Sequence, residues 1–221
     1  MRPFIFDFNG TLFQDTEIHR RAWKRFMARY GFPITDETFD RYMCGPTNRV
    51  ILAHFFGDQL AEAEYDRLSA EKEAVYRDIV LADPTLQKLT PGAPQMLDTL
   101  AEHHIPCAIA TASIRENVDF YMDVLQIRRW FDYGHIFFDA GSLPGKPDPA
   151  IYRMAMKKLG FPRDQTTVVE DSIAGIQSAS GAGIRHIIAI DTTLGPDAFR
   201  GIPNVVAVIH DFCDFKEFID E

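Results

Sequence analysis

Short apolar runs alternate with amphipathic helical stretches from residue 93 to the end of the chain, and this alternation restricts the fold more than any other feature. Helices are expected at 93–104, 116–125, 149–159 and 173–180, and strands at 107–111, 135–138, 166–170, 184–190 and near Val205. Strands and helices that alternate in this way predict a mostly parallel sheet with helices on both faces.

A further apolar strand is expected at residues 3–7, far from the others in sequence. It must join the same sheet, because a single strand is not stable alone. Helical spacing without a convincing strand follows, over about 16–31, 35–43, 48–56 and 58–81. The stretch A-D-P-T-L-Q-K-L-T-P-G then marks a linker. We therefore expect a Rossmann-like α/β core of residues 1–14 and 86–221, and an all-helical cap of residues 15–85 inserted after the first strand.

Charge and cysteine content restrict the partners and the compartment. The formal net charge of -9 is spread along the 221 residues, which argues against nucleic-acid and anionic-membrane binding. The three cysteines form no C-x-x-C pair, which indicates reduced thiols in a cytoplasmic protein. No apolar run approaches the length of a membrane span. A cap that must open and close over its core favours a monomer.

The carboxyl ends of the expected strands hold the candidate chemistry, because ligands of open α/β sheets bind at that edge. The set consists of Asp7 and Asn9 after the first strand, Thr111 and Ser113 after the next, Glu170 and Asp171, and Lys146 in a nearby loop. The three carboxylates are hard oxygen ligands of the kind that Mg²⁺ takes. Lys146 and Thr111 offer donors to a phosphate. A carboxylate nucleophile with a cation and a lysine suits phosphoryl transfer.

Each of these residues also has a structural interpretation. A strand-end aspartate is often a turn residue, E-D-S can cap the helix that follows, and Lys146 can be a solvated loop lysine. What favours a site is their joint occurrence at strand ends, in one order along the chain.

Four segments carry a resemblance to a known family. D-F-N-G-T-L, A-T-A-S, G-K-P-D-P-A-I-Y and V-V-E-D-S-I-A-G-I-Q-S-A resemble the four motifs of the haloacid dehalogenase-like superfamily. More narrowly, the chain is similar to the β-phosphoglucomutase-like phosphatases with a helical cap. The resemblance covers nearly the whole chain.

The resemblance implies a role for each matching residue. Asp7 corresponds to the nucleophile that forms an aspartyl-phosphate, and Lys146 to the lysine that steadies nucleophile and phosphate. Thr111 and the backbone N–H of Ala112 correspond to the phosphate-binding motif. The Mg²⁺ ligands implied are Asp7, Glu170, Asp171 and the backbone carbonyl of Asn9. In the cap, His19 and Lys72 match residues near the substrate and the acid/base group, and Arg49 is a third candidate, although the corresponding arginine of the mutase aligns with Asn48.

One departure from the family pattern bears on activity: Asn9 stands where the family has its second aspartate. That aspartate protonates the leaving oxygen and then activates water, whereas an amide transfers no proton at neutral pH. The leading hypothesis is a Mg²⁺-dependent phosphatase of a small phosphorylated metabolite that is slow on alkyl phosphates. The alternatives are a sugar-phosphate mutase, a dehalogenase, a phosphonate-cleaving enzyme and an impaired protein that only binds a phosphometabolite.

Overall fold

The computed structural model describes residues 2–138 and 143–219, and its contacts divide the chain into two compact units. Unit 1 consists of residues 1–14 and 88–221, and unit 2 of residues 15–87. Residues 86 and 87, expected in the core, belong with unit 2. There the side chain of Gln87 donates to the Val80 carbonyl, 3.0 Å away, and so ties the segment to the preceding helix.

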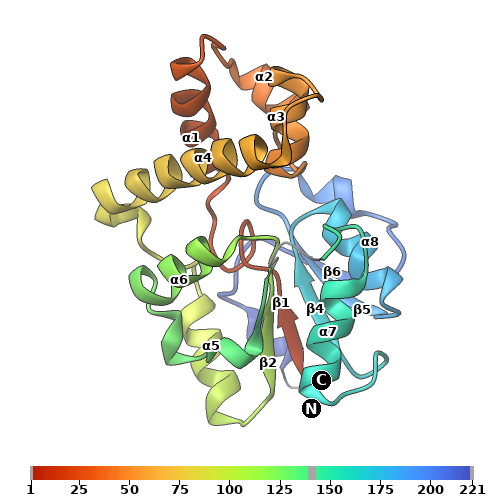
Figure 1. The fold of residues 1–221 in the computed structure, drawn as a ribbon. Coiled ribbons are helices and arrows are strands. Elements are labelled where there is room, and N and C mark those ends of the chain that lie inside the picture. The colour runs from red at the N-terminus through yellow and green to blue at the C-terminus, as the bar shows by residue number, and fades with distance from the viewer. Residues whose placement is uncertain (1, 139–142, 220–221) are drawn as a thin grey trace. The chain divides into compact units, whose positions relative to one another are not determined.

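Unit 1 is built on six parallel strands in the order β3-β2-β1-β4-β5-β6 (Figure 1). The strands are β1 (Phe4–Phe6), β2 (Cys107–Ala110), β3 (Ile136–Phe137), β4 (Thr167–Glu170), β5 (His186–Ile190) and β6 (Val205–Ile209). Phe4 is in register with Cys107 on one side and Thr167 on the other, so β1 is central. The chain runs outward from β1 to β3 and then crosses to β4. This reversal makes the carboxyl ends of β1 and β4 the expected ligand site.

Both faces of this sheet are covered. The helices of unit 1 are α5 (Ala93–Glu102), α6 (Arg115–Val124), α7 (Ala150–Leu159) and α8 (Ile173–Gly181). On one face Ile5, Val168 and Ile187 pack with buried residues of α7 and α8. On the other face the rings of Phe4 and Phe6 lie 5.5 and 6.1 Å from those of Phe215 and Phe212. The predicted α/β class with a parallel sheet is confirmed.

Unit 2 contains helices and no strand. They are α1 (Thr16–Arg29), α2 (Asp36–Tyr42), α3 (Asn48–Phe56) and α4 (Glu62–Ala82). A core of its own holds them together, including Trp23, Phe26, Leu52 and Leu68. The start predicted for the last helix, residue 58, is wrong by four positions. The chain leaves α3 through Gly57 at φ 92°, and the extended Ala61 precedes the first turn of α4.

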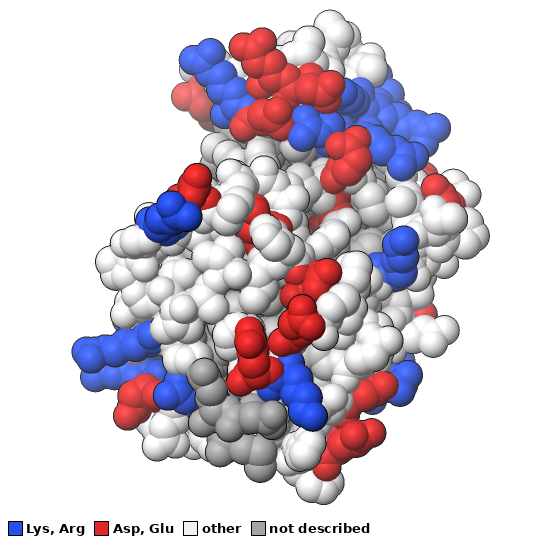
Figure 2. Space-filling view, turned by 180° about the vertical axis from the view of Figure 1, so that it is seen from behind, with Lys and Arg blue, Asp and Glu red and all other residues white. Residues whose placement is uncertain are grey.

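Acidic and basic side chains are interleaved on the face of unit 2 seen at the top of Figure 2. Ion pairs of this unit include Arg20 with Asp40 at 2.8 Å and Lys24 with Asp36 at 2.6 Å. Such exposed pairs are screened by solvent and contribute little to stability. Within residues 2–138 and 143–219, no helix combines the length and the apolar character needed to cross a bilayer.

Candidate active site

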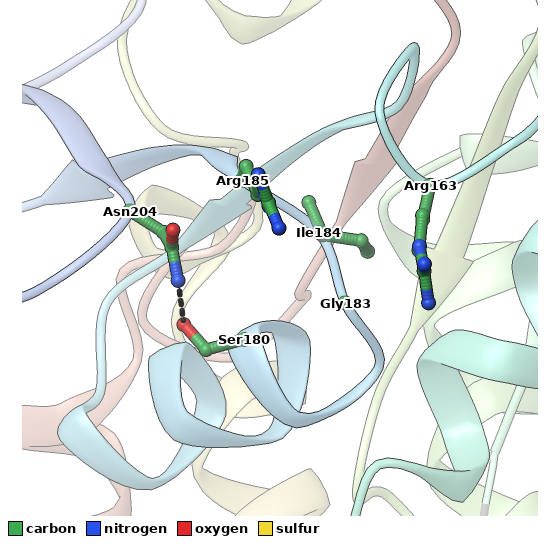
Figure 3. Close-up of a pocket in the computed structure, with 6 residues that line it drawn as sticks. All are labelled: Arg163, Ser180, Gly183, Ile184, Arg185 and Asn204. Atoms are coloured by element: carbon green, nitrogen blue, oxygen red, sulfur yellow. Dashed lines mark hydrogen bonds between the residues drawn. The ribbon is translucent and has the colours of Figure 1, made fainter.

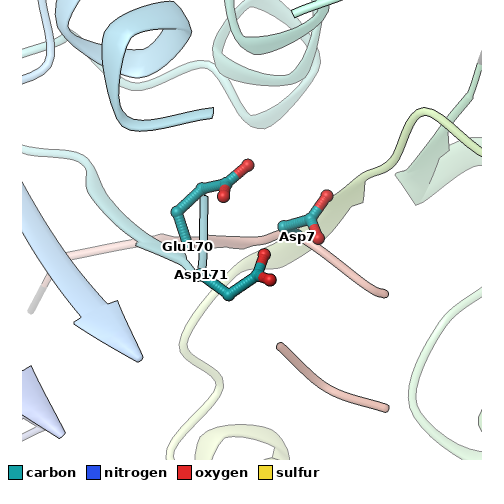
Figure 4. A group of neighbouring side chains, drawn as sticks. All are labelled: Asp7, Glu170 and Asp171. Atoms are coloured by element: carbon teal, nitrogen blue, oxygen red, sulfur yellow. The ribbon is translucent and has the colours of Figure 1, made fainter. Parts of the chain in front are cut away.

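Three carboxylates meet where β1 and β4 end. Asp7 directly follows β1, and its backbone N–H donates to the Val169 carbonyl, 3.0 Å away. Glu170 is the last residue of β4, and Asp171 follows it. One oxygen of each carboxylate lies within 4.8 Å of the others, and the three side chains lie close together (Figure 4). The fold thus brings together residues 7, 170 and 171, as the sequence predicts.

Lys146 joins two of these carboxylates. Its Nζ donates to Asp7 Oδ1 over 2.6 Å and to Glu170 Oε1 over 2.5 Å. It also donates to the Ala110 carbonyl at 3.1 Å, at the end of β2, and to the Tyr152 hydroxyl at 3.2 Å. The alternative interpretation of Lys146 as a solvated loop lysine is therefore wrong. A single ammonium binds the ends of three neighbouring strands.

Burial and the neighbouring charges shift the acidities of this cluster. Burial raises the pKa of Asp7 to about 7, and the Glu170 carboxylate adds to the rise, while Lys146 opposes it. Burial alone would lower the pKa of Lys146, but Asp7 and Glu170 hold it well above its usual range. Lys146 is therefore a fixed positive charge. The two negative charges beside it favour a further cation at the site.

Glu170 is fully buried and each of its oxygens accepts two hydrogen bonds. Oε1 accepts from Lys146 and from the Tyr152 hydroxyl, the latter at 2.9 Å. Oε2 accepts from the backbone N–H and the hydroxyl of Ser172, both at 3.0 Å. Ser172 also caps α8, because its hydroxyl accepts from the Gly175 N–H at 3.0 Å. The E-D-S segment thus serves both as a helix cap and as part of the site.

Asp171 lies against the turn that follows β1. Gly10, at φ 78°, has no side chain there, and a Cβ at this position would fall 2.0 Å from Asp171 Oδ2. Both the positive φ and the close carboxylate require glycine. This turn brings the Asp7 loop and Asp171 together, and carboxylate oxygens are ligands of the kind that hard cations take.

The Asn9 side chain lies among three hydroxyl groups. Its Oδ1 accepts from Ser113 Oγ at 2.6 Å and from Thr111 Oγ1 at 3.2 Å, and its Nδ2 donates to the Tyr121 hydroxyl at 2.9 Å. The Thr111 hydroxyl in turn accepts from the Ser113 backbone N–H at 3.1 Å. Ala112 lies between these two residues and is exposed. Thr111 of the expected phosphate-binding residues, together with the adjacent Ser113, is thus hydrogen-bonded directly to Asn9.

Two tyrosines of this site, Tyr121 and Tyr152, were missed by sequence reasoning. Both are buried on the inner faces of α6 and α7, where helical periodicity registers them only as core residues. For Tyr152 the signal available was its place in K-P-D-P-A-I-Y, six residues after Lys146. For Tyr121 no sequence signal separates it from an ordinary core tyrosine.

Within unit 2, His19 and Lys72 lie side by side. Lys72 Nζ is 2.7 Å from His19 Nδ1, and it donates to Glu73 Oε1, also over 2.7 Å. Asn48 donates to the same Glu73 oxygen at 2.7 Å. Burial opposes ionisation of Glu73, but Lys72, His19 and the Asn48 hydrogen bond bring its pKa down to about 2. Trp23 belongs to the core of the unit, as expected, with Lys72 Nζ 5.2 Å from its ring centroid.

Arg49 makes different contacts. Its guanidinium donates two hydrogen bonds to Glu62, at 3.1 and 2.6 Å, and lies 4.2 Å from the centroid of the Tyr65 ring. These partners hold it on the outside of α3, where about half of its side chain is exposed. Of the three cap residues predicted to contact substrate, His19 and Lys72 lie together in the structure and Arg49 lies apart from them. The residue before Arg49, Asn48, is hydrogen-bonded to Glu73, which also binds Lys72.

A groove of about 440 Å³ lies at the opposite edge of the sheet, near the amino ends of β4, β5 and β6 (Figure 3). Its lining consists of Arg163, Ser180, Gly183, Ile184, Arg185 and Asn204. There the Asn204 side chain donates to the Ser180 hydroxyl at 3.2 Å. Because the carboxylates follow the other ends of the strands, this groove is separate from the candidate site.

Comparison with known proteins agrees with this geometry. The chain is 26% identical over 193 residues to a phosphorylated carbohydrates phosphatase of Thermotoga maritima, covering 86% of this chain and 85% of that protein. It is 30% identical over 197 residues to hexitol phosphatase A of Escherichia coli, covering 86% and 83%. A solved structure, a HAD hydrolase of family IA, variant 3, from Entamoeba histolytica, superposes with a TM-score of 0.91 at 32% identity, covering 100% of this chain and 98% of that one.

The family model named haloacid dehalogenase-like hydrolase matches residues 4–189, which include all four motifs. The resemblance expected from those motifs is confirmed. With its nucleophile candidate, lysine and carboxylates at the carboxyl ends of β1 and β4, the chain belongs to the haloacid dehalogenase-like hydrolase family.

Proposed function

We propose that this chain is a Mg²⁺-dependent phosphatase that hydrolyses a small phosphorylated carbohydrate through an aspartyl-phosphate on Asp7. The observation that carries the proposal is the Lys146 ammonium, shared between Asp7 and Glu170 within 2.6 Å of each, in a chain of this family. The names of two relatives, a phosphorylated carbohydrates phosphatase and a hexitol phosphatase, support this substrate class and favour hydrolysis over a mutase reaction.

The reaction has two steps. A carboxylate oxygen of Asp7 attacks phosphorus, and the bond from phosphorus to the ester oxygen breaks, with the electron pair leaving on that oxygen. Water then attacks phosphorus, the bond from phosphorus to the Asp7 oxygen breaks, and a proton of the water passes to solvent, so that inorganic phosphate leaves and the Asp7 carboxylate returns. Lys146 offsets charge on the carboxylate and the phosphoryl oxygens throughout. The Thr111 hydroxyl and the Ala112 N–H bind those oxygens at the end of β2.

The donor set fits a magnesium ion. Asp7 and Asp171, with the Asn9 carbonyl, are hard oxygen ligands, and the three carboxylate oxygens lie within 4.8 Å of one another. Both oxygens of Glu170 already accept two hydrogen bonds, so we propose that Glu170 acts mainly by holding Lys146 and the Asp171 segment. When bound, the ion offsets the charge that repels an anionic phosphate from Asp7.

Position 9 limits the choice of substrate. Without a carboxyl group there, the leaving oxygen gains no proton from this residue, and such help is typically worth about 10²–10⁴-fold in rate. We therefore expect turnover of alkyl phosphates to be slow and turnover of substrates with better leaving groups to be less affected. A mutase needs proton transfer in both directions, so Asn9 disfavours it as well.

In unit 2 we propose His19 and Lys72 as substrate-binding residues. Asn48 is a better third candidate than Arg49, because it shares Glu73 with Lys72 whereas Arg49 is paired with Glu62.

The test is phosphate release from a panel of sugar and polyol phosphates, with Mg²⁺ and with EDTA. We expect release that requires Mg²⁺ and is lost in Asp7→Asn, whereas Asp132→Asn, which changes an exposed aspartate of unit 1, behaves like wild type. Mg²⁺ should also raise the unfolding temperature of wild type more than that of Asp171→Asn. Release that persists in Asp7→Asn, or that is indifferent to EDTA, would refute the proposal.

A further inference from the structure

Tyr121 is held in place by residues on both sides of Asn9. Its ring stacks on Phe8, with centroids 4.5 Å apart and planes 26° apart, and meets the edge of Phe13 at 6.2 Å. Only 1% of the residue is exposed. The phenol oxygen is therefore fixed by packing and does not depend on its hydrogen bond to stay where it is.

This fixed oxygen determines how the Asn9 amide is oriented. Nδ2 donates to Tyr121 Oη at 2.9 Å, while Oδ1 accepts from the hydroxyls of Ser113 and Thr111. An amide has one donor end and one acceptor end, and here each faces matching partners. Turning the amide over would require all three hydroxyls to exchange donor and acceptor roles.

The Thr111 hydroxyl is the end point of this network. It donates to Asn9 Oδ1 and accepts from the Ser113 backbone N–H at 3.1 Å, so its oxygen is held from two sides. A phosphoryl oxygen that binds there takes the one hydroxyl proton in place of Asn9 Oδ1, while the Ser113 N–H keeps the Thr111 oxygen in position, which lowers the cost of ordering it on binding.

We propose that Asn9, Ser113 and Tyr121 position the Thr111 hydroxyl for the phosphoryl group, with Tyr121 as the residue that orients the amide. Position 9 thus has a positioning role in this chain in place of proton transfer. The inference rests on the proposed function only in taking the Thr111 segment as the phosphate site.

The test compares two tyrosine-to-phenylalanine variants. Tyr121→Phe removes the hydroxyl and keeps the ring against Phe8. Tyr133→Phe is the matched control, because its buried hydroxyl makes no hydrogen bond among the described residues of unit 1. The probe is inorganic phosphate, whose affinity is measured by calorimetry without turnover. Kinetics with a series of aryl phosphates of graded leaving-group pKa follow.

We expect Tyr121→Phe to weaken phosphate binding about 5- to 10-fold, as loss of one organising hydrogen bond would, and Tyr133→Phe to leave it unchanged. KM should rise by a similar factor. The dependence of kcat/KM on leaving-group pKa should stay as in wild type, because a positioning residue gives no proton. Ser113→Ala should reproduce these effects. In the double variant the losses should not add, since both residues act through one amide.

Three results would overturn the inference. The first is that Tyr121→Phe and Ser113→Ala bind phosphate as tightly as Tyr133→Phe does. The second is that kcat/KM of Tyr121→Phe depends more steeply on leaving-group pKa than that of wild type, which would make Tyr121 a proton donor, and the third is that wild type does not bind phosphate. The binding measurement separates this inference from the proposed function. Wild type that binds phosphate through the network yet releases none from any substrate would refute the function and leave the positioning role supported.

Discussion

Asn9→Asp is the substitution that most directly tests the chemistry of this site. It exchanges Nδ2 for an oxygen at the same place, 2.9 Å from the Tyr121 hydroxyl, which can rotate from accepting to donating. The Ser113 and Thr111 hydroxyls continue to donate to the other oxygen. Side-chain volume is nearly unchanged and these three hydrogen bonds can be kept, so we expect the variant to fold like wild type.

The gain in rate follows from these three donors. General acid–base help is worth about 10²–10⁴-fold, but a carboxylate that accepts several hydrogen bonds has a lowered pKa. The new aspartate would then be ionised at neutral pH, which suits activation of water and leaves little acid for the leaving oxygen. We therefore expect kcat/KM for alkyl phosphates to rise near the lower end of that range, about 10²-fold, and by less than about 10-fold for nitrophenyl phosphate.

The assay is kcat/KM for alkyl and aryl phosphates, together with rapid mixing. Wild type with nitrophenyl phosphate should show a burst of nitrophenolate equal to the enzyme present, followed by slow turnover, because breakdown of the aspartyl-phosphate lacks a base. Asn9→Asp should remove the burst. Asn204→Asp, which adds the same charge at the opposite edge of the sheet, is the control. An unchanged kcat/KM for alkyl phosphates would show that position 9 does not limit the reaction.

Three further predictions concern buried charge and thiols. Lys146→Met should lower activity at least about 10²-fold and destabilise the protein by roughly 3–5 kcal/mol, because Asp7 and Glu170 lose their shared partner. A free energy of unfolding in urea that lies within about 1 kcal/mol of the wild-type value, which is the error of such fits, would contradict this prediction. Glu73 has a folded-state pKa of about 2 against 4.5 when unfolded, so its contribution, about 3 kcal/mol at most, is present above pH 4.5 and lost as the pH falls toward 2. Glu73→Gln should therefore be less stable than wild type at neutral pH, and its free energy of unfolding should change less between pH 4.5 and pH 2. If the free energy of unfolding depends on pH equally in the two proteins over this range, the low pKa does not belong to Glu73. Cys107 is half-buried and burial raises its pKa to about 12, whereas Cys44 and Cys213 are exposed. A thiol reagent should therefore label two cysteines per native chain rapidly and the third much more slowly. Equally rapid labelling of all three in the native protein would contradict the protection of Cys107.

Periodicity and motif order predicted most of the fold. The helix expected at 48–56 is α3 (Asn48–Phe56), and every expected strand is present within a few residues. The motifs also led us to expect Asp7, Lys146, Glu170 and Asp171 at one edge of the sheet, and the structure brings them together there, because parallel strands have their carboxyl ends at one edge regardless of the helices between them.

Contacts between distant helices were beyond sequence reasoning. Tyr121 is 112 residues from Asn9, and only tertiary packing places its hydroxyl beside that amide. In unit 2, the choice between Asn48 and Arg49 depended on which of two adjacent positions on α3 faces Glu73, and a helix boundary alone does not settle it. Residues on apolar helix faces that carry a polar atom are therefore the site residues that sequence reasoning misses most easily.

The central position of β1 has a consequence for synthesis of the protein. Asp7 and Lys146 are 139 residues apart, and at about 5–20 residues per second the ribosome needs roughly 7 to 28 seconds to pass from one to the other. Throughout that time the nascent F-I-F segment has no completed sheet to enter. The strand that carries the nucleophile is thus made before the other five strands of the sheet and is enclosed only after β4 has been made, which leaves it open to chaperones and aggregation during translation.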